Sequence, residues 1–130
     1  MFHRNRKWSV ADMTEDLKAR WDCQGMGDAE ALAKMLVHQT WCLCTGFRLN
    51  GYLYLNDSTS EDGAAEYAIV KEATGIQVES ITFCWTTDAQ AVRYIQKISA
   101  GKYDGENYGC ALSNSARIEP SGHHACHLCA

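Results

Sequence analysis

Residues 41–55 read Trp-Cys-Leu-Cys-Thr-Gly-Phe-Arg-Leu-Asn-Gly-Tyr-Leu-Tyr-Leu, two strand-like runs on either side of an Asn-Gly pair. Such a pair is the strongest short-range signal for a two-residue hairpin loop, because both loop residues take positive φ. A loop of this length also fixes the register, so that Leu49 faces Tyr52 and Phe47 faces Tyr54. The sequence therefore predicts an antiparallel hairpin that turns at Asn50-Gly51.

The same register divides the side chains of this hairpin between the two faces of a sheet. One face carries Trp41, Leu43, Thr45, Phe47, Leu49, Tyr52 and Tyr54, and the other carries Cys42, Cys44, Gly46, Arg48, Leu53 and Leu55. Both faces hold large apolar groups, whereas the helices of a two-layer domain cover only one face. We therefore expect the second face either to be covered by the N- or C-terminal segment or to form a two-fold interface with another copy.

Downstream of a polar connection, the sequence predicts a second hairpin with strands at residues 66–72 and 76–85. The three residues between them end in Gly75, which suits a loop with a glycine bulge. Thr87 and Gln90 then form a capping box, the signature of a helix N-terminus. We expect this helix to end at Gly101, which is well placed as a C-cap.

Two further helices are expected upstream. Ser9 is a good N-cap, and a helical apolar face follows it: Val10, Met13, Leu17 and Trp21. Asp28 caps a second helix, with an apolar stripe of Ala29, Leu32, Met35 and Leu36. Together these elements predict an α+β fold with two layers, in which an antiparallel sheet of about four strands (two hairpins) packs against three helices.

The expected order is α-α-β-β-β-β-α followed by an irregular C-terminal segment at residues 103–130, all in a single domain of residues 1–130. Residues 1–8 form a basic arm, with Arg4-Asn5-Arg6-Lys7 at its centre. The net charge of −4 argues against general affinity for nucleic acid. No apolar run is long enough for a secretory signal or a membrane-spanning helix, and seven cysteines cannot all pair within one chain. We therefore expect a cytoplasmic protein with free thiols and no membrane contact.

The densest group of metal-ligating residues is the C-terminal tail. It contains His123, His124, Cys126, His127 and Cys129. The Cys126-x-x-Cys129 spacing lets two thiolates bind one zinc, and His123 or His127 can supply a further ligand, with Cys110 available from outside the tail. One such motif is only half of a structural zinc site, so adventitious binding by the tail is the competing interpretation.

A second thiol group comprises His38, Cys42, Cys44 and Cys84, for which buried packing is the favoured interpretation. The weak catalytic candidates are His38, Arg48, Glu61 and Asp62, and no established catalytic motif contains them. The candidate ligand or interface residues are Trp41, Phe47, Tyr52, Tyr54, Leu53 and Leu55, from the two faces of the first hairpin.

The absence of a catalytic motif and the two apolar faces favour one functional hypothesis: a small, non-catalytic binding or adaptor module. It would act as a homodimer through a sheet face and engage a protein or small-molecule ligand. The alternatives are a zinc-binding protein that uses the C-terminal cluster, and a small enzyme with a pocket between sheet and helices.

Overall fold

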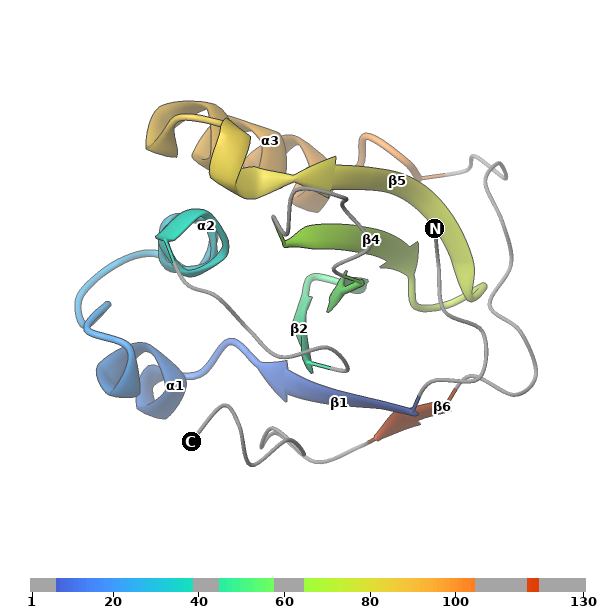
Figure 1. The fold of residues 1–130 in the computed structure, drawn as a ribbon, viewed down its shortest axis with the longest axis horizontal. Coiled ribbons are helices and arrows are strands. Elements are labelled where there is room, and N and C mark those ends of the chain that lie inside the picture. The colour runs from blue at the N-terminus through green and yellow to red at the C-terminus, as the bar shows by residue number, and fades with distance from the viewer. Residues whose placement is uncertain (1–6, 39–44, 58–64, 105–116, 120–130) are drawn as a thin grey trace.

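The computed structural model describes residues 7–38, 45–57, 65–104 and 117–119, and these form an α+β fold around one mixed sheet (Figure 1). The strand order is β5-β4-β3-β2-β1-β6. The strands are β1 (Lys7–Asp12), β2 (Thr45–Leu49), β3 (Tyr52–Asn56), β4 (Glu66–Lys71), β5 (Ile76–Thr82) and β6 (Arg117–Glu119). The helices are α1 (Glu15–Arg20), α2 (Asp28–His38), α3 (Asp88–Ser99) and the short 3-10 helix η1 (Phe83–Trp85).

The first hairpin has the register that its sequence predicts. Leu49 pairs with Tyr52 and Phe47 pairs with Tyr54, across a loop in which Asn50 and Gly51 take φ values of 52° and 84°. A left-handed conformation at two successive residues matches the twist of the flanking strands, which is why Asn-Gly occupies this loop. The predicted division of side chains between the two faces is therefore confirmed for residues 46–49 and 52–55. The part of the first strand predicted at residues 41–44 lies outside the described residues.

The second hairpin differs from its prediction in three details. Lys71 pairs with Ile76, so the loop is the four residues 72–75 rather than three. The irregularity in the ladder lies between Ile69 and Val70, where Val78 is the extra residue on β5, and not at Gly75. The second strand also ends at Thr82, because the backbone enters the turn of η1 at the next residue.

The first predicted helix is wrong at its start. Residues 7–12 form β1, which runs parallel to β2 and pairs Ser9 with Thr45 and Ala11 with Phe47. Trp8 and Val10 share one face, so the sequence here has the period of a strand, and the helical spacing from Val10 to Trp21 is coincidental. α1 begins only after Thr14, whose Oγ1 accepts the Leu17 N–H at 3.1 Å.

The order of elements is therefore β-α-α-β-β-β-β-α-β, and the sheet is mixed rather than wholly antiparallel. Lys7 and Trp8 belong to the sheet and not to a terminal arm. α2 begins at Asp28 as predicted, and the Thr87–Gln90 capping box starts α3. α3 ends in a Schellman motif, in which Gly101 with φ 109° follows the cap residue Ala100.

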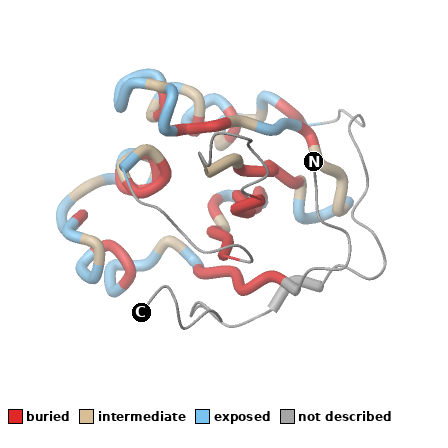
Figure 2. Tube along the Cα trace, viewed as in Figure 1, coloured by how far each residue is buried: buried red, intermediate tan, exposed pale blue. Residues whose placement is uncertain are grey.

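Both faces of the sheet are buried, as Figure 2 shows along the central strands. The larger cluster joins the helices to one face; its strand residues include Phe47, Tyr54, Tyr67 and Ile69, and its helix residues include Leu32, Met35, Leu36, Ile95 and Ile98. The second cluster lies on the other face and contains Trp8, Val10, Leu53, Leu55 and Val70, each at most 2% exposed. The second face is therefore closed within the single chain. The terminal segments expected to cover it, residues 1–6 and 120–130, lie outside the described residues.

Gly46 shows how tightly this second cluster is packed. A Cβ at this position would lie 2.6 Å from Leu55 Cδ2 and 3.5 Å from Val10 Cγ2. Since both neighbours are fully buried, we expect Gly46→Ala to lower the free energy of unfolding by about 1–3 kcal/mol, the usual cost of overpacking. Gly27→Ala is the control, because a Cβ there meets nothing within 4 Å. Equal stability of the two variants in urea unfolding would contradict the packing described here.

Among the described residues, no helix combines the length and apolar character needed to span a bilayer.

Candidate interaction site

The two catalytic candidates that the structure describes, His38 and Arg48, do not meet at one site. His38 is the last residue of α2, and its Nε2 lies 2.7 Å from Asp88 Oδ1 at the start of α3. Arg48 pairs across the sheet with Leu53, and so lies on the face opposite to that packed against the helices. Glu61 and Asp62 lie outside the described residues. Of the predicted acid–base groups, the structure describes His38 and Arg48 alone, and it places them on opposite faces of the sheet.

Arg48 is held by two carboxylates. Its Nη1 donates to Asp12 Oδ1 at 2.8 Å, and its Nε donates to the two Glu72 carboxylate oxygens at 2.9 and 3.1 Å. The hydrogen bond to Asp12, followed by that to Glu72, raises the pKa of Arg48. This cluster ties β1 and β2 to the residue that follows β4. We interpret Arg48 as a structural residue and not as a substrate-binding one.

The metal predictions fall largely outside the described chain. Cys126, Cys129, His123 and His127 lie there, as do Cys42, Cys44 and Cys110. Within the described ranges, no group of three or more His, Cys, Asp or Glu side chains is arranged to hold a metal ion. Cys23 is buried and Cys84 is exposed. The zinc site in the C-terminal tail stays a prediction from the sequence.

The candidate interface residues are inside the molecule. Phe47, Tyr52, Tyr54, Leu53 and Leu55 are each at most 3% exposed, and Trp41 lies outside the described residues. A ligand or partner role for this set stays an untested prediction. On the helix side, aromatic rings fill the space between sheet and α3: Phe83 meets Tyr67 and Tyr94 edge-on, each at 5.9 Å between ring centres.

The buried tyrosines of this layer predict sensitivity to alkali. Burial raises the pKa of Tyr54 and of Tyr94 above the ordinary value of 10. Because the pKa is raised in the folded state, the unfolded chain loses its phenol proton at a lower pH than the folded protein does. The stability that the protonated tyrosine contributes is therefore complete below pH 10 and is lost as the pH rises further. For Tyr54 alone, we expect the free energy of unfolding to fall by about 1.4 kcal/mol for each pH unit above 10.

Urea unfolding at a series of alkaline pH values measures this slope. Tyr54→Phe is the informative variant, because it removes the phenol and keeps the ring. The slope should be shallower in Tyr54→Phe than in the wild type. Identical slopes would contradict the buried, protonated state of Tyr54.

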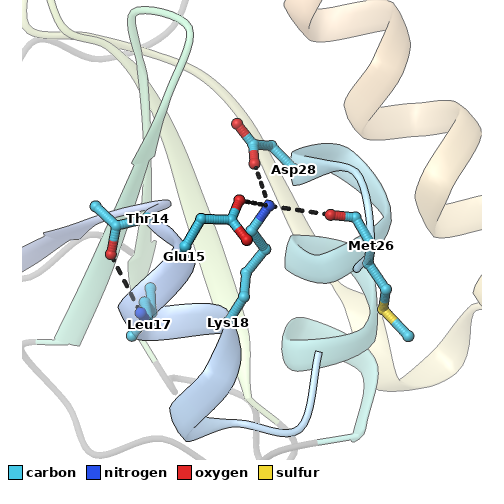
Figure 3. Close-up of polar contacts among 6 residues, drawn as sticks. All are labelled: Thr14, Glu15, Leu17, Lys18, Met26 and Asp28. Carbon is cyan, nitrogen blue, oxygen red and sulfur yellow. Dashed lines mark hydrogen bonds and ion pairs between the residues drawn. The ribbon is translucent and has the colours of Figure 1, made fainter. Parts of the chain in front are cut away.

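Lys18 on α1 is a buried cation with three acceptors (Figure 3). Its Nζ lies 2.7 Å from Glu15 Oε2, and it donates to Asp28 Oδ1 at 2.9 Å and to the Met26 carbonyl at 3.0 Å. The hydrogen bond that this ammonium group donates to Glu15, and then the one to Asp28, raise its pKa. Because an ammonium has three N–H donors and three acceptors surround it, Lys18 joins α1 to the start of α2 and has no free donor for a substrate.

We expect Lys18→Met to lower the melting temperature at neutral pH by roughly 5 °C, because the stem still packs but the three contacts are lost. Arg20→Met is the matched control on the exposed side of the same helix and should change the melting temperature little. Since the pKa of Lys18 is raised, its contribution is complete below pH 10.5 and is lost only as the pH rises through the raised value. A Lys18→Met variant as stable as the wild type at pH 7 would contradict a stabilising role for the three Lys18 contacts.

Among the described residues, Trp85 is the large hydrophobic side chain that is exposed, at 67%. η1 positions it: Phe83 is buried in the aromatic layer, whereas the turn carries Trp85 two residues later to the surface. Thr86 fixes the turn, because its N–H and its hydroxyl both donate to the Phe83 carbonyl, at 2.9 and 2.7 Å. An indole held outward by this rigid turn differs from a residue left exposed by chance.

Two helices lie beside the turn that carries Trp85. Asp88 lies in the first turn of α3, three residues after Trp85, and its pair with His38 joins α3 to the end of α2. α2 also packs against η1. Cys84 adds an exposed thiol. We name this surface the Trp85 corner: Cys84, Trp85, Asp88 and His38.

The sequence contained a signal for this corner that the strand prediction overlooked. The capping box at Thr87 leaves only Thr86 between Trp85 and the helix, which is too short for a strand that runs as far as residue 85. The close approach of the helix start to the predicted strand end was a reason to expect a turn among Phe83, Cys84 and Trp85.

Comparison with known proteins finds no matching protein-family model, no matching curated protein and no matching solved structure.

Proposed function

We propose that this chain is a non-catalytic binding module that acts as a homodimer, and that the Trp85 corner is its contact surface. The observation that supports this most strongly is the 67% exposure of Trp85 on a turn fixed by two hydrogen bonds. Tryptophan is the residue most enriched among the side chains that dominate binding energy at protein interfaces. A tryptophan side chain has only two rotatable bonds, so it gives a large contact area at a low cost in conformational entropy on binding.

The choice of surface follows from burial. A sheet face was expected to form the dimer, but the first hairpin is at most 2% exposed in the single chain both at Phe47 and Tyr54 on one face and at Leu53 and Leu55 on the other. Burying them again in an interface gains nothing, whereas Trp85 has most of its apolar area still in water. Self-association through a two-fold axis uses the same patch on both copies and is the commonest way to bury such a residue.

Light scattering of the purified full chain tests the proposal. We expect Trp85→Ala to weaken self-association at least tenfold, roughly the effect of truncating a central interface residue. Gln96→Ala is the matched control, because Gln96 is exposed on α3 away from the corner and should leave the association unchanged. If Trp85→Ala weakens self-association no more than Gln96→Ala does, the proposed surface is overturned.

A further inference from the structure

The loop of the first hairpin contains a chemically reactive pair of residues. Asn50 is the one asparagine of the sequence that precedes a glycine; the others precede Arg6, Asp57, Tyr108 and Ser115. The backbone nitrogen after an asparagine can attack its side-chain amide, and glycine hinders this attack least because it has no side chain. Both loop residues are exposed, and a Cβ at Gly51 would meet nothing within 4 Å. Solvent and neighbouring atoms therefore leave the pair open to reaction.

The reaction at such a pair is deamidation through a cyclic imide. The Gly51 nitrogen gives up its proton and bonds to Cγ of Asn50, the Cγ–Nδ2 bond breaks, and the amide nitrogen leaves as ammonia. Water then opens the ring. Attack at Cγ yields aspartate with the ordinary backbone, whereas attack at the main-chain carbonyl carbon yields isoaspartate, in which the main chain runs through Cβ and Cγ.

The backbone conformation of Asn50 decides whether this ring can close. Closure requires Cβ and the Gly51 nitrogen to lie almost eclipsed across the Cα–C bond. With φ at 52°, Asn50 occupies the left-handed region, where ψ is about +30 to +60°. Around the tetrahedral Cα, a ψ in this range places Cβ nearly opposite the Gly51 nitrogen. The conformation that the two-residue loop requires therefore keeps Cγ of Asn50 away from its nucleophile.

Contacts on both sides hold the loop in this conformation. The Glu72 N–H donates to the Gly51 carbonyl at 2.9 Å, and the paired residues Leu49 and Tyr52 are at most 6% exposed. A large change of ψ at Asn50 would disturb this bond and this pairing. We propose that Asn50 is a site of spontaneous deamidation that the closed hairpin keeps unreactive, so that opening of the hairpin exposes the chain to an irreversible modification.

The isoaspartate product makes this change one-way. It adds an atom to the main chain of a loop that has only two residues, so the register of Leu49 with Tyr52 is lost. β2 and β3 lie inside the sheet and supply residues to both apolar clusters, so a chain with isoaspartate does not recover the fold. The aspartate product keeps the backbone and tolerates the left-handed conformation, so it keeps the fold.

Peptide mapping by mass spectrometry tests the proposal on the full chain, incubated at mildly alkaline pH with and without urea. We expect Asn50 to convert at least roughly a hundredfold more slowly in the native protein, because only the opened fraction reacts. Asn56 is the matched control on the same hairpin. It precedes Asp57, whose side chain hinders the attack, and should convert far more slowly than Asn50 in urea.

Gly46→Ala provides a variant that opens more often, because its Cβ overpacks the second cluster. Without urea, it should convert Asn50 at least about fivefold faster than the wild type, whereas Gly27→Ala should match the wild type. Equal rates in Gly46→Ala and Gly27→Ala would overturn control by hairpin opening. If Gly46→Ala does not fold, the comparison of the wild type with and without urea decides.

The remaining outcomes are equally direct. Equal rates with and without urea would overturn protection by the loop, and an Asn50 that stays unmodified in urea would overturn the site itself. After removal of urea, Asn50→Asp should regain the stability of the wild type, and the isoaspartate form should not. An isoaspartate form that refolds to wild-type stability would overturn the one-way change.

Discussion

Trp8→Ala is expected to lower the free energy of unfolding by about 3–5 kcal/mol, the range typical of an aromatic removed from a core. Trp8 is 0% exposed and lies in the second cluster with Val10, Leu53, Leu55 and Val70. A tryptophan in a solvated terminal arm, as the sequence suggested, would change stability by no more than about 0.5 kcal/mol. The variant therefore distinguishes directly between a strand that contains Trp8 and the predicted terminal arm at residues 1–8.

Urea unfolding provides the measurement, and Trp85→Ala provides the control. The control makes the same substitution at a side chain that is 67% exposed, so it should change the stability of the monomer by less than about 0.5 kcal/mol. The comparison must be made at a concentration below self-association. Equal losses in the two variants would contradict the burial of Trp8.

Phe83→Ala is expected to cost a similar amount, about 3–5 kcal/mol. Phe83 is fully buried and makes edge-to-face contacts with Tyr67 on β4 and Tyr94 on α3, so it joins the sheet to the last helix. It also anchors the turn that presents Trp85. We therefore expect the variant to weaken self-association as well as stability.

Phe83→Leu separates the two effects, because leucine keeps an apolar group in the aromatic layer and should recover part of the lost stability. The measurements are urea unfolding and light scattering of the same samples. If Phe83→Ala lost less than about 1 kcal/mol, the aromatic layer would not be the contact between α3 and the sheet.

The features that the sequence predicted correctly are local ones. The Asn50-Gly51 loop and the Thr87–Gln90 capping box depend on residues that are adjacent or three apart, so the interactions that determine them are all between near neighbours in the sequence. α2 begins at Asp28 for the same reason. These elements needed no information about distant parts of the chain.

The strand at residues 7–12 was missed because its partner is distant in sequence. β1 pairs with β2 in parallel through Ser9 and Thr45, and no short-range pattern reports such a pairing. Val10, Met13, Leu17 and Trp21 happen to have helical spacing, and the alternation of Trp8 and Val10 was too short to oppose it. The error also changed the functional argument, because Trp8 and Val10 belong to the cluster that closes the second face.

The candidate site was less predictable than the fold. The sequence directed attention to apolar residues of the first hairpin. Those that the structure describes are core residues, buried within the chain. Composition and periodicity do not show whether a Trp after a strand turns inward or outward; that depends on η1 and on the Phe83 anchor.

The central claim is that the Trp85 corner joins two copies of the chain. Sedimentation equilibrium of the wild-type chain from roughly 1 µM to 1 mM tests it most directly. The molar mass should rise with concentration from 14.5 kDa toward twice that value, and Trp85→Ala should hold it near 14.5 kDa over the same range. A wild-type mass of 14.5 kDa at every concentration would contradict the claim.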